Sequence, residues 1–124
     1  MPIKGIHWIA RVAAIVMALN IDPPNANFPA AGGNATHQII NMSDQRMGFK
    51  VKSSNNDHYR VKPVYGFVPP QGRAPIEIIR LAGPAKEDKL VVQWAEVPTE
   101  EEDPQAPFKA GAQAGEVILP IKSE

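Results

Sequence analysis

Side chains that could perform catalysis or hold a metal ion are sparse in this sequence and do not fall at useful spacings. The chain has no cysteine. Its three histidines, His7, His37 and His58, are far apart in the sequence, and none pairs at ligand spacing with another histidine or an acidic residue. No G-x-S-x-G nucleophile motif and no G-x-x-x-x-G-K phosphate loop occurs. We therefore predict no catalytic residues, no metal site, no cofactor and no enzymatic activity.

The residues best suited to chemistry form a group that could bind a partner. Lys50, Lys52, Ser53 and Ser54 lie within one short stretch. Because alternate residues of a strand point to the same side, the two lysines share a face opposite Phe49. Positive charge beside hydroxyl groups suits an acidic peptide, including a phosphorylated one. A nucleic-acid site needs exposed aromatic rings beside the cations. Phe49 falls on the apolar side, so we predict no nucleic-acid partner.

Short strands separated by turns must position these residues. The runs at 47–52, 58–62 and 89–97 alternate apolar and polar side chains or are strongly β-prone. Proline makes up 13 of the 124 residues, and no helical periodicity persists after residue 20. These features predict an all-β fold, a seven-stranded, immunoglobulin-like antiparallel β-sandwich. We expect residues 63–72 to form a connection and residues 108–113 a single helical turn.

The charge of the chain is balanced overall but unevenly distributed. Thirteen basic residues match thirteen acidic residues, and a chain of 124 residues supports one domain. Residues 46–80 carry seven basic and two acidic residues, whereas residues 81–124 carry four basic and nine acidic residues. The two segments could attract an acidic partner or a second copy of the chain, head to tail. Alternatively, they are ordinary solvated faces that partly neutralise each other.

The N-terminal segment differs from the rest of the chain. Its apolar run at 12–19 is too short to span a bilayer, so we predict no stable membrane insertion. The run fits a signal peptide, a short amphipathic helix or an extension upstream of Met17. Two Asn-x-Ser/Thr triplets begin at Asn34 and Asn41. They matter only in a secretory compartment.

Several sequence blocks occur in the order typical of a known domain. They are IDPP at 21–24, FPAAGG at 28–33, FKVKSS at 49–54, YRVKP at 59–63, GFVP at 66–69 and KLVVQ at 89–93. Over roughly residues 20–121 the chain resembles the major sperm protein (MSP) domain family. Further stretches look like its small sperm-specific nematode branch: 53–57, 86–89 and 106–113. Family members typically begin shortly before the N-x-D-P-P block. The resemblance thus favours an N-terminal extension at 1–16, an MSP-like domain at 17–124 and no signal peptide.

The resemblance also implies a function. It implies a non-enzymatic structural or interaction protein of the sperm cytoskeleton, a component or modulator of the filament assembly that drives amoeboid sperm motility. The implied partners are proteins, namely the main sperm filament protein or a second copy of the chain in a homodimer. The implied location is the cytoplasm, in the cytoskeleton of the sperm pseudopod.

A second branch of the family implies an alternative function. That branch binds short acidic (FFAT-like) peptide motifs through a basic strand face. Its pocket resembles a set of residues in this sequence: Lys50, Lys52, Ser53, Ser54, Lys89 and Val91. Glu116 stands where that branch carries a basic residue, which departs from its pattern. The alternative is therefore an adaptor for acidic peptides.

Overall fold

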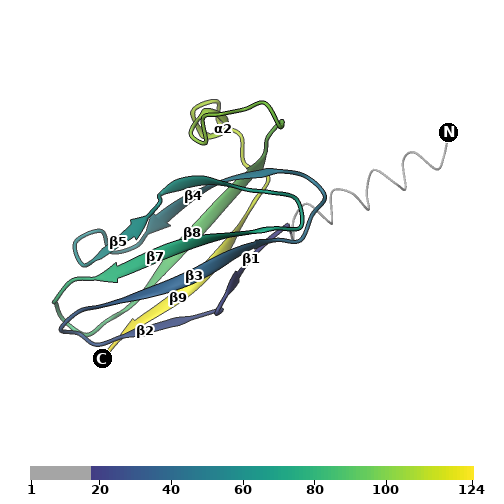
Figure 1. Cartoon of the computed structure of the whole chain (residues 1–124). Coiled ribbons are helices and arrows are strands. Elements are labelled where there is room, and N and C mark those ends of the chain that lie inside the picture. The colour runs from purple at the N-terminus through teal and green to yellow at the C-terminus, as the bar shows by residue number, and fades with distance from the viewer. Residues whose placement is uncertain (1–17) are drawn as a thin grey trace, which may run out of the picture.

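The chain folds into two β-sheets packed face to face (Figure 1). The structure is a computed structural model that describes residues 18–124, so the predicted extension at 1–16 lies outside the described residues. The first sheet has four strands in the order β1 (Leu19–Asp22), β3 (Gly33–Asn41), β7 (Arg73–Arg80) and β5 (Tyr59–Lys62). The second has five in the order β2 (Ala26–Phe28), β9 (Gly115–Ser123), β8 (Glu87–Glu96), β4 (Met47–Ser53) and β6 (Tyr65–Val68). The predicted all-β sandwich is confirmed.

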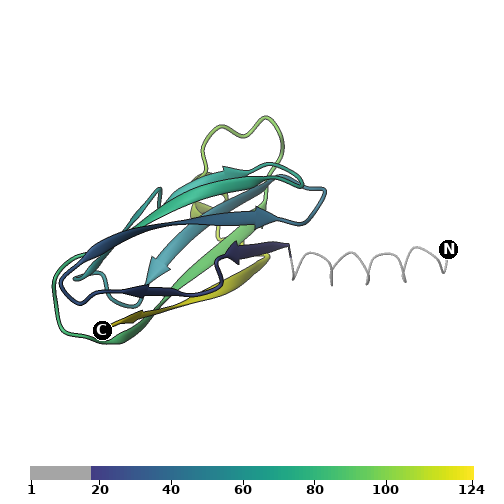
Figure 2. The same cartoon turned by 60° about the horizontal axis from the view of Figure 1, so that its bottom comes forward.

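Two details of the predicted fold are wrong. Residues 18–124 form nine strands rather than seven, and β6 lies inside the segment 63–72 that was expected to be a connection. The arrangement is also not wholly antiparallel, because β2 runs parallel to β9 along the edge of the second sheet (Figure 2). The proline pair Pro23–Pro24 interrupts the chain between β1 and β2, and the two strands join different sheets. An edge strand of three residues can therefore pair with β9 in parallel.

The core lies between the sheets and follows the two-residue periodicity of the strands. The central strands β4 and β8 bury alternate side chains: Met47, Phe49, Val51, Leu90, Val92 and Trp94. Each such side chain contributes about 1.5–3 kcal/mol by leaving water. The intervening residues of the same strands consequently point away from the core, onto the outer face of the five-stranded sheet.

One short helix interrupts the β structure. Helix α2 (Ala106–Lys109) belongs to the long connection between β8 and β9, and this connection stands out from one end of the sandwich (Figure 1). The sequence predicted a helical turn slightly later, at 108–113. The Phe108 ring lies 5.9 Å from the Tyr65 ring, and the Pro107 ring lies over Gly48 of β4. The helix thereby covers one end of the outer face of the five-stranded sheet.

Among residues 18–124, no helix is both long enough and apolar enough to cross a bilayer.

Candidate functional site

The strand register brings most of the predicted binding residues together on the outer face of the five-stranded sheet. Lys52 of β4 pairs with Val91 of β8, and Lys50 pairs with Gln93. Lys89 precedes Val91 by two residues, so both point to the same side. Neighbouring strands lie about 4.8 Å apart, and residues two apart on a strand lie about 7 Å apart. The predicted lysines and Val91 therefore form one compact surface.

Strand β9 adds residues that the sequence-based prediction missed. Ile118 pairs with Val91 and is 49% exposed, and Pro120 pairs with Lys89. Glu116, which the sequence already marked as a departure from the acidic-peptide branch, pairs with Gln93. Buried and exposed side chains alternate along β9, with Leu119 buried between Ile118 and Pro120. This alternation is the sequence feature that could have predicted that Ile118 points outward. We call the surface of Lys50, Lys52, Lys89, Val91 and Ile118 the lysine face.

The lysine face has uncompensated positive charge. Neither Lys52 nor Lys89 forms an ion pair with a carboxylate in the part of the chain that the structure describes. The ammonium group of Lys50 lies 5.6 Å from the centre of the Tyr65 ring. The Glu116 carboxylate, at the border of this surface, accepts a hydrogen bond from Gln113 (3.1 Å). The face is consequently an aliphatic strip with two free cations beside it.

The hydroxyl groups of the two predicted serines form hydrogen bonds within the fold, although Ser54 is exposed. The Ser54 hydroxyl accepts a hydrogen bond from the backbone N–H of Lys89 (2.9 Å) and donates one to Asp88 (3.2 Å). Ser53, at the end of β4, is half-buried, and its hydroxyl accepts a hydrogen bond from the backbone N–H of Asn55 (3.0 Å). The Ser54 hydroxyl holds the turn after β4 against the beginning of β8, whereas the Ser53 hydroxyl bonds within that turn.

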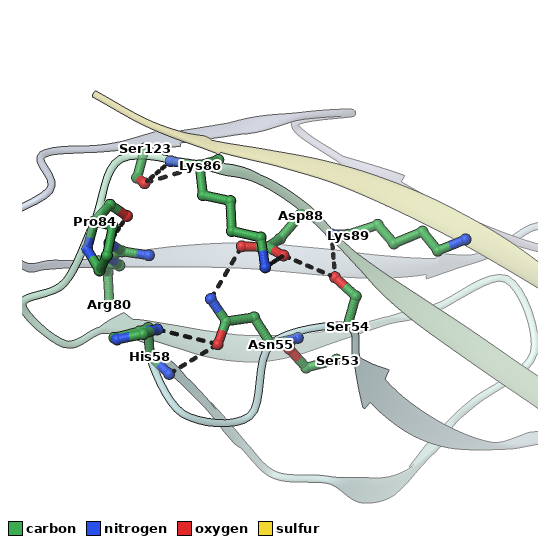
Figure 3. A network of polar contacts seen from close by, with 10 residues as sticks. All are labelled: Ser53, Ser54, Asn55, His58, Arg80, Pro84, Lys86, Asp88, Lys89 and Ser123. Carbon is green, nitrogen blue, oxygen red and sulfur yellow. Dashed lines mark hydrogen bonds and ion pairs between the residues drawn. The ribbon is translucent and has the colours of Figure 1, made fainter.

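Asp88 is the centre of this network (Figure 3). Its carboxylate side chain is 3% exposed and accepts a hydrogen bond from the Asn55 amide (3.1 Å), while the Lys86 ammonium lies 3.6 Å away. The Asn55 carbonyl oxygen in turn accepts a hydrogen bond from the backbone N–H of His58 (3.2 Å). Figure 3 shows the Lys89 side chain extending away from the network. The network therefore fixes the backbone at this end and leaves Lys89 available.

The lysine face is bounded at both ends. Helix α2 and the residues after it border one end, through the contacts of Phe108 with Tyr65 and of Gln113 with Glu116. At the other end lies a shallow hollow of about 390 Å³ lined by Ser54 and residues 86–89. The exposed strip between these borders could accept a protein segment that carries acidic and apolar side chains.

Between positions 18 and 124, no group of three or more His, Asp or Glu side chains could hold a metal ion.

Comparisons with known proteins identify the family. The family model of the MSP (Major sperm protein) domain matches residues 18–117, so the chain belongs to this family. It is 63% identical over 103 residues to sperm-specific class P protein 34 of Caenorhabditis elegans, covering 83% of this chain and 96% of that protein.

Two solved structures of C. elegans family members are also similar. WR4 is 61% identical, with a TM-score of 0.84 and coverage of 86% of this chain and 98% of WR4. SSP-19, an MSP-domain protein like family member, is 48% identical, with a TM-score of 0.81 and coverage of 85% and 98%. The predicted resemblance to the MSP domain family and its sperm-specific nematode branch is confirmed.

Proposed function

We propose that this chain is a non-enzymatic protein-binding component or modulator of filament assembly in the sperm cytoskeleton. Its membership of the MSP domain family and its high identity to sperm-specific nematode proteins support this proposal. The expected location is the cytoplasm of the sperm pseudopod. The expected partners are the main sperm filament protein and a second copy of the chain.

The observation that carries the proposal is the composition of the lysine face. Ile118 is 49% exposed beside the half-buried Val91, and the free cations Lys52 and Lys89 flank them. Exposed aliphatic side chains at the centre of a charged surface are typical of protein-interaction sites. The aliphatic groups gain free energy by leaving water, and the lysines select an acidic partner surface.

Cosedimentation with filaments of the main sperm filament protein tests this proposal. The whole chain should pellet with filaments or change their growth rate, because its lysine face binds the filament or its subunits. The double variant Lys52→Glu/Lys89→Glu should lose most of this effect. A wild-type chain that neither pellets with filaments nor alters their growth at any concentration would contradict the proposal.

An adaptor that binds acidic, FFAT-like peptides is the alternative. The cluster of Lys50, Lys52 and Lys89 around Val91 favours it, since such a strip fits an extended acidic segment. Two features oppose it: Glu116 borders the face, and the serine hydroxyls are engaged within the fold.

Titration with an acidic peptide by isothermal calorimetry distinguishes the two functions. Saturable binding that disappears in Lys52→Glu would support the adaptor, because the Lys52 side chain points outward and its replacement leaves the fold intact. An unchanged affinity in Lys52→Glu would exclude this face as the peptide site. An alanine-substituted peptide without acidic residues serves as the control ligand.

A further inference from the structure

The shape of the lysine face restricts what can occupy it. Helix α2 is packed over Gly48 and Tyr65 on the same outer face, so it rises beside the strip that contains Val91. A second flat sheet could not approach this strip closely without meeting the helix. Helix α2 therefore favours a projecting loop or an extended segment, and not a flat sheet surface, as the occupant of the lysine face.

The chain itself carries a projecting segment of the opposite charge. Residues Glu100–Asp103 are four consecutive acidic residues in the connection that stands out from the end of the sandwich (Figure 1). Glu100, Glu102 and Asp103 are exposed, while Glu101 is half-buried. We call this segment the acidic loop. Its charge complements that of the free lysines Lys52 and Lys89.

Arg46 holds the acidic loop in a defined position. Its guanidinium donates hydrogen bonds to the backbone carbonyls of Pro98 (2.8 Å) and Glu101 (2.7 Å). The same guanidinium carbon lies 3.6 Å from the centre of the Phe67 ring. Arg46 donates to carbonyl oxygens and not to the carboxylates. The carboxylates of Glu100 and Asp103 accept hydrogen bonds from neighbouring residues of the chain, and both residues remain exposed. A loop fixed in advance loses less conformational entropy when it binds.

The acidic loop of a chain does not occupy the lysine face of the same chain. Lys52 and Lys89 make no ion pair with it within residues 18–124. The loop begins after Val97, six residues beyond Val91, which corresponds to about 20 Å along an extended strand. A contact between loop and face therefore has to join two molecules.

We propose that the acidic loop of one copy docks on the lysine face of the next copy. This inference rests on the proposed function and names the contact through which the chain associates. Because the two surfaces lie at different places on the molecule, a two-fold pair with reciprocal docking would close as a dimer. The proposed contact instead runs head to tail, from each copy to the next. Such a contact leaves one loop and one face free at the ends, and copies add without closing unless the rotation forms a ring.

Charge-reversal variants in sedimentation velocity test this contact with the whole chain. Both Lys52→Glu/Lys89→Glu, the face variant, and Glu100→Lys/Glu102→Lys, the loop variant, should weaken self-association by about tenfold or more. The matched control is Lys62→Glu/Arg73→Glu, which makes the same charge change as the face variant on exposed residues of the other sheet. The control should associate like the wild type, and circular dichroism confirms that every variant is folded.

Mixing the two variants gives the decisive result. The face variant keeps a normal loop, and the loop variant keeps a normal face, so one wild-type contact remains available between them. The reversed loop and the reversed face also carry opposite charges, so we expect the mixture to associate again, although neither variant associates alone. A mixture that stays monomeric would overturn the head-to-tail contact, as would a loop variant that associates like the wild type.

The outcomes also separate this inference from the proposed function. A wild-type chain that cosediments with filaments but is monomeric by itself overturns the head-to-tail contact and leaves the proposed function standing. If an acidic peptide binds the face while the chain stays monomeric, the occupant is a different protein and the self-docking inference is wrong.

Discussion

At the scale of single residues, Asn41 illustrates how one amide can hold several segments together. Its side chain is 1% exposed and donates hydrogen bonds to the carbonyls of Gln45 (2.7 Å), Val68 (3.2 Å) and Pro69 (3.1 Å). Its carbonyl oxygen accepts from the backbone N–H of Ser43 (2.9 Å). We expect Asn41→Ala to lower the free energy of unfolding by about 2–4 kcal/mol, because buried groups lose their partners. Urea denaturation measures this loss.

Asn34 provides the matched control for this prediction. It lies on the same strand, begins the other Asn-x-Ser/Thr triplet and is exposed. Asn34→Ala should change stability by less than about 0.5 kcal/mol, and an equal loss in both variants would contradict the role assigned to Asn41. The sequence motif alone could not separate the two residues, because only the position of β6 beside β3 determines which amide is buried.

Arg80 is a buried cation whose replacement should not harm the fold. It is 2% exposed, donates one hydrogen bond to the Pro84 carbonyl (2.8 Å) and lies 5.1 Å from the centre of the Tyr59 ring. Its Nε and Nη1 atoms have no hydrogen-bond partner within residues 18–124. We expect Arg80→Met to raise the unfolding free energy by about 1–4 kcal/mol, since it removes the desolvation cost and keeps the stem.

Thermal denaturation of Arg80→Met and Arg80→Ala together tests this argument. The alanine variant removes the charge and also the packing of the stem, so it should be less stable than the methionine variant. A methionine variant that is clearly less stable than the wild type would show that the guanidinium itself stabilises the fold.

At the scale of elements, β6 shows why part of the fold could not be predicted. Gly66 was interpreted as part of a connection, because glycine usually marks a turn. In the structure Gly66 pairs with Phe49 of β4, and a Cβ added to it would lie 2.7 Å from the Phe49 ring. Gly66 therefore lacks a side chain where the buried Phe49 ring packs against the backbone of β6. By contrast, β4 and β8 were predicted well, because the alternation of apolar and polar residues in their sequences indicates which side of each strand is buried.

Substitution of Gly66 by alanine should consequently destabilise this edge of the sheet. The added methyl group must displace the Phe49 ring, which is 1% exposed, at a cost of about 1–3 kcal/mol. Gly33→Ala is the control, because a Cβ there meets its nearest atom, in Pro29, at an ordinary 3.5 Å. Chemical denaturation should show a loss for Gly66→Ala alone, and similar stabilities for the two variants would refute the packing argument.

At the scale of the whole molecule, only part of the candidate site could be predicted from the sequence. The lysines Lys50 and Lys52 follow from the alternation of one strand, and their neighbours on β4 were predicted with them. Ile118 and helix α2 belong to segments far along the chain, and their place beside the lysines depends on the sheet order. A pairing order between distant strands is decided by the packing of all strands together. The alternation of a single strand does not contain it.

The head-to-tail contact predicts how association of the whole molecule depends on salt and pH. Raising the salt concentration from about 0.1 M to about 1 M shortens the screening length from about 10 Å to about 3 Å, which weakens attraction between lysines and carboxylates. A contact made only by Val91 and Ile118 would not weaken, because salt does not screen apolar burial. Light scattering coupled to gel filtration should therefore show dissociation at high salt, and association that persists would contradict a charged contact.

The pH dependence follows from the state of the acidic loop. The hydrogen bond from the Thr99 hydroxyl (2.7 Å) lowers the pKa of Glu100 from its usual 4.5. The carboxylates are charged above their pKa and lose their charge as the pH falls through it, whereas the lysines stay charged throughout. Association should thus be constant near neutral pH and weaken on acidification, and the lowered pKa of Glu100 means that its charge persists to a more acidic pH than that of a glutamate without this hydrogen bond. Circular dichroism at each pH controls for unfolding, and association that survives neutralisation in folded protein would show that the loop carboxylates do not make the contact.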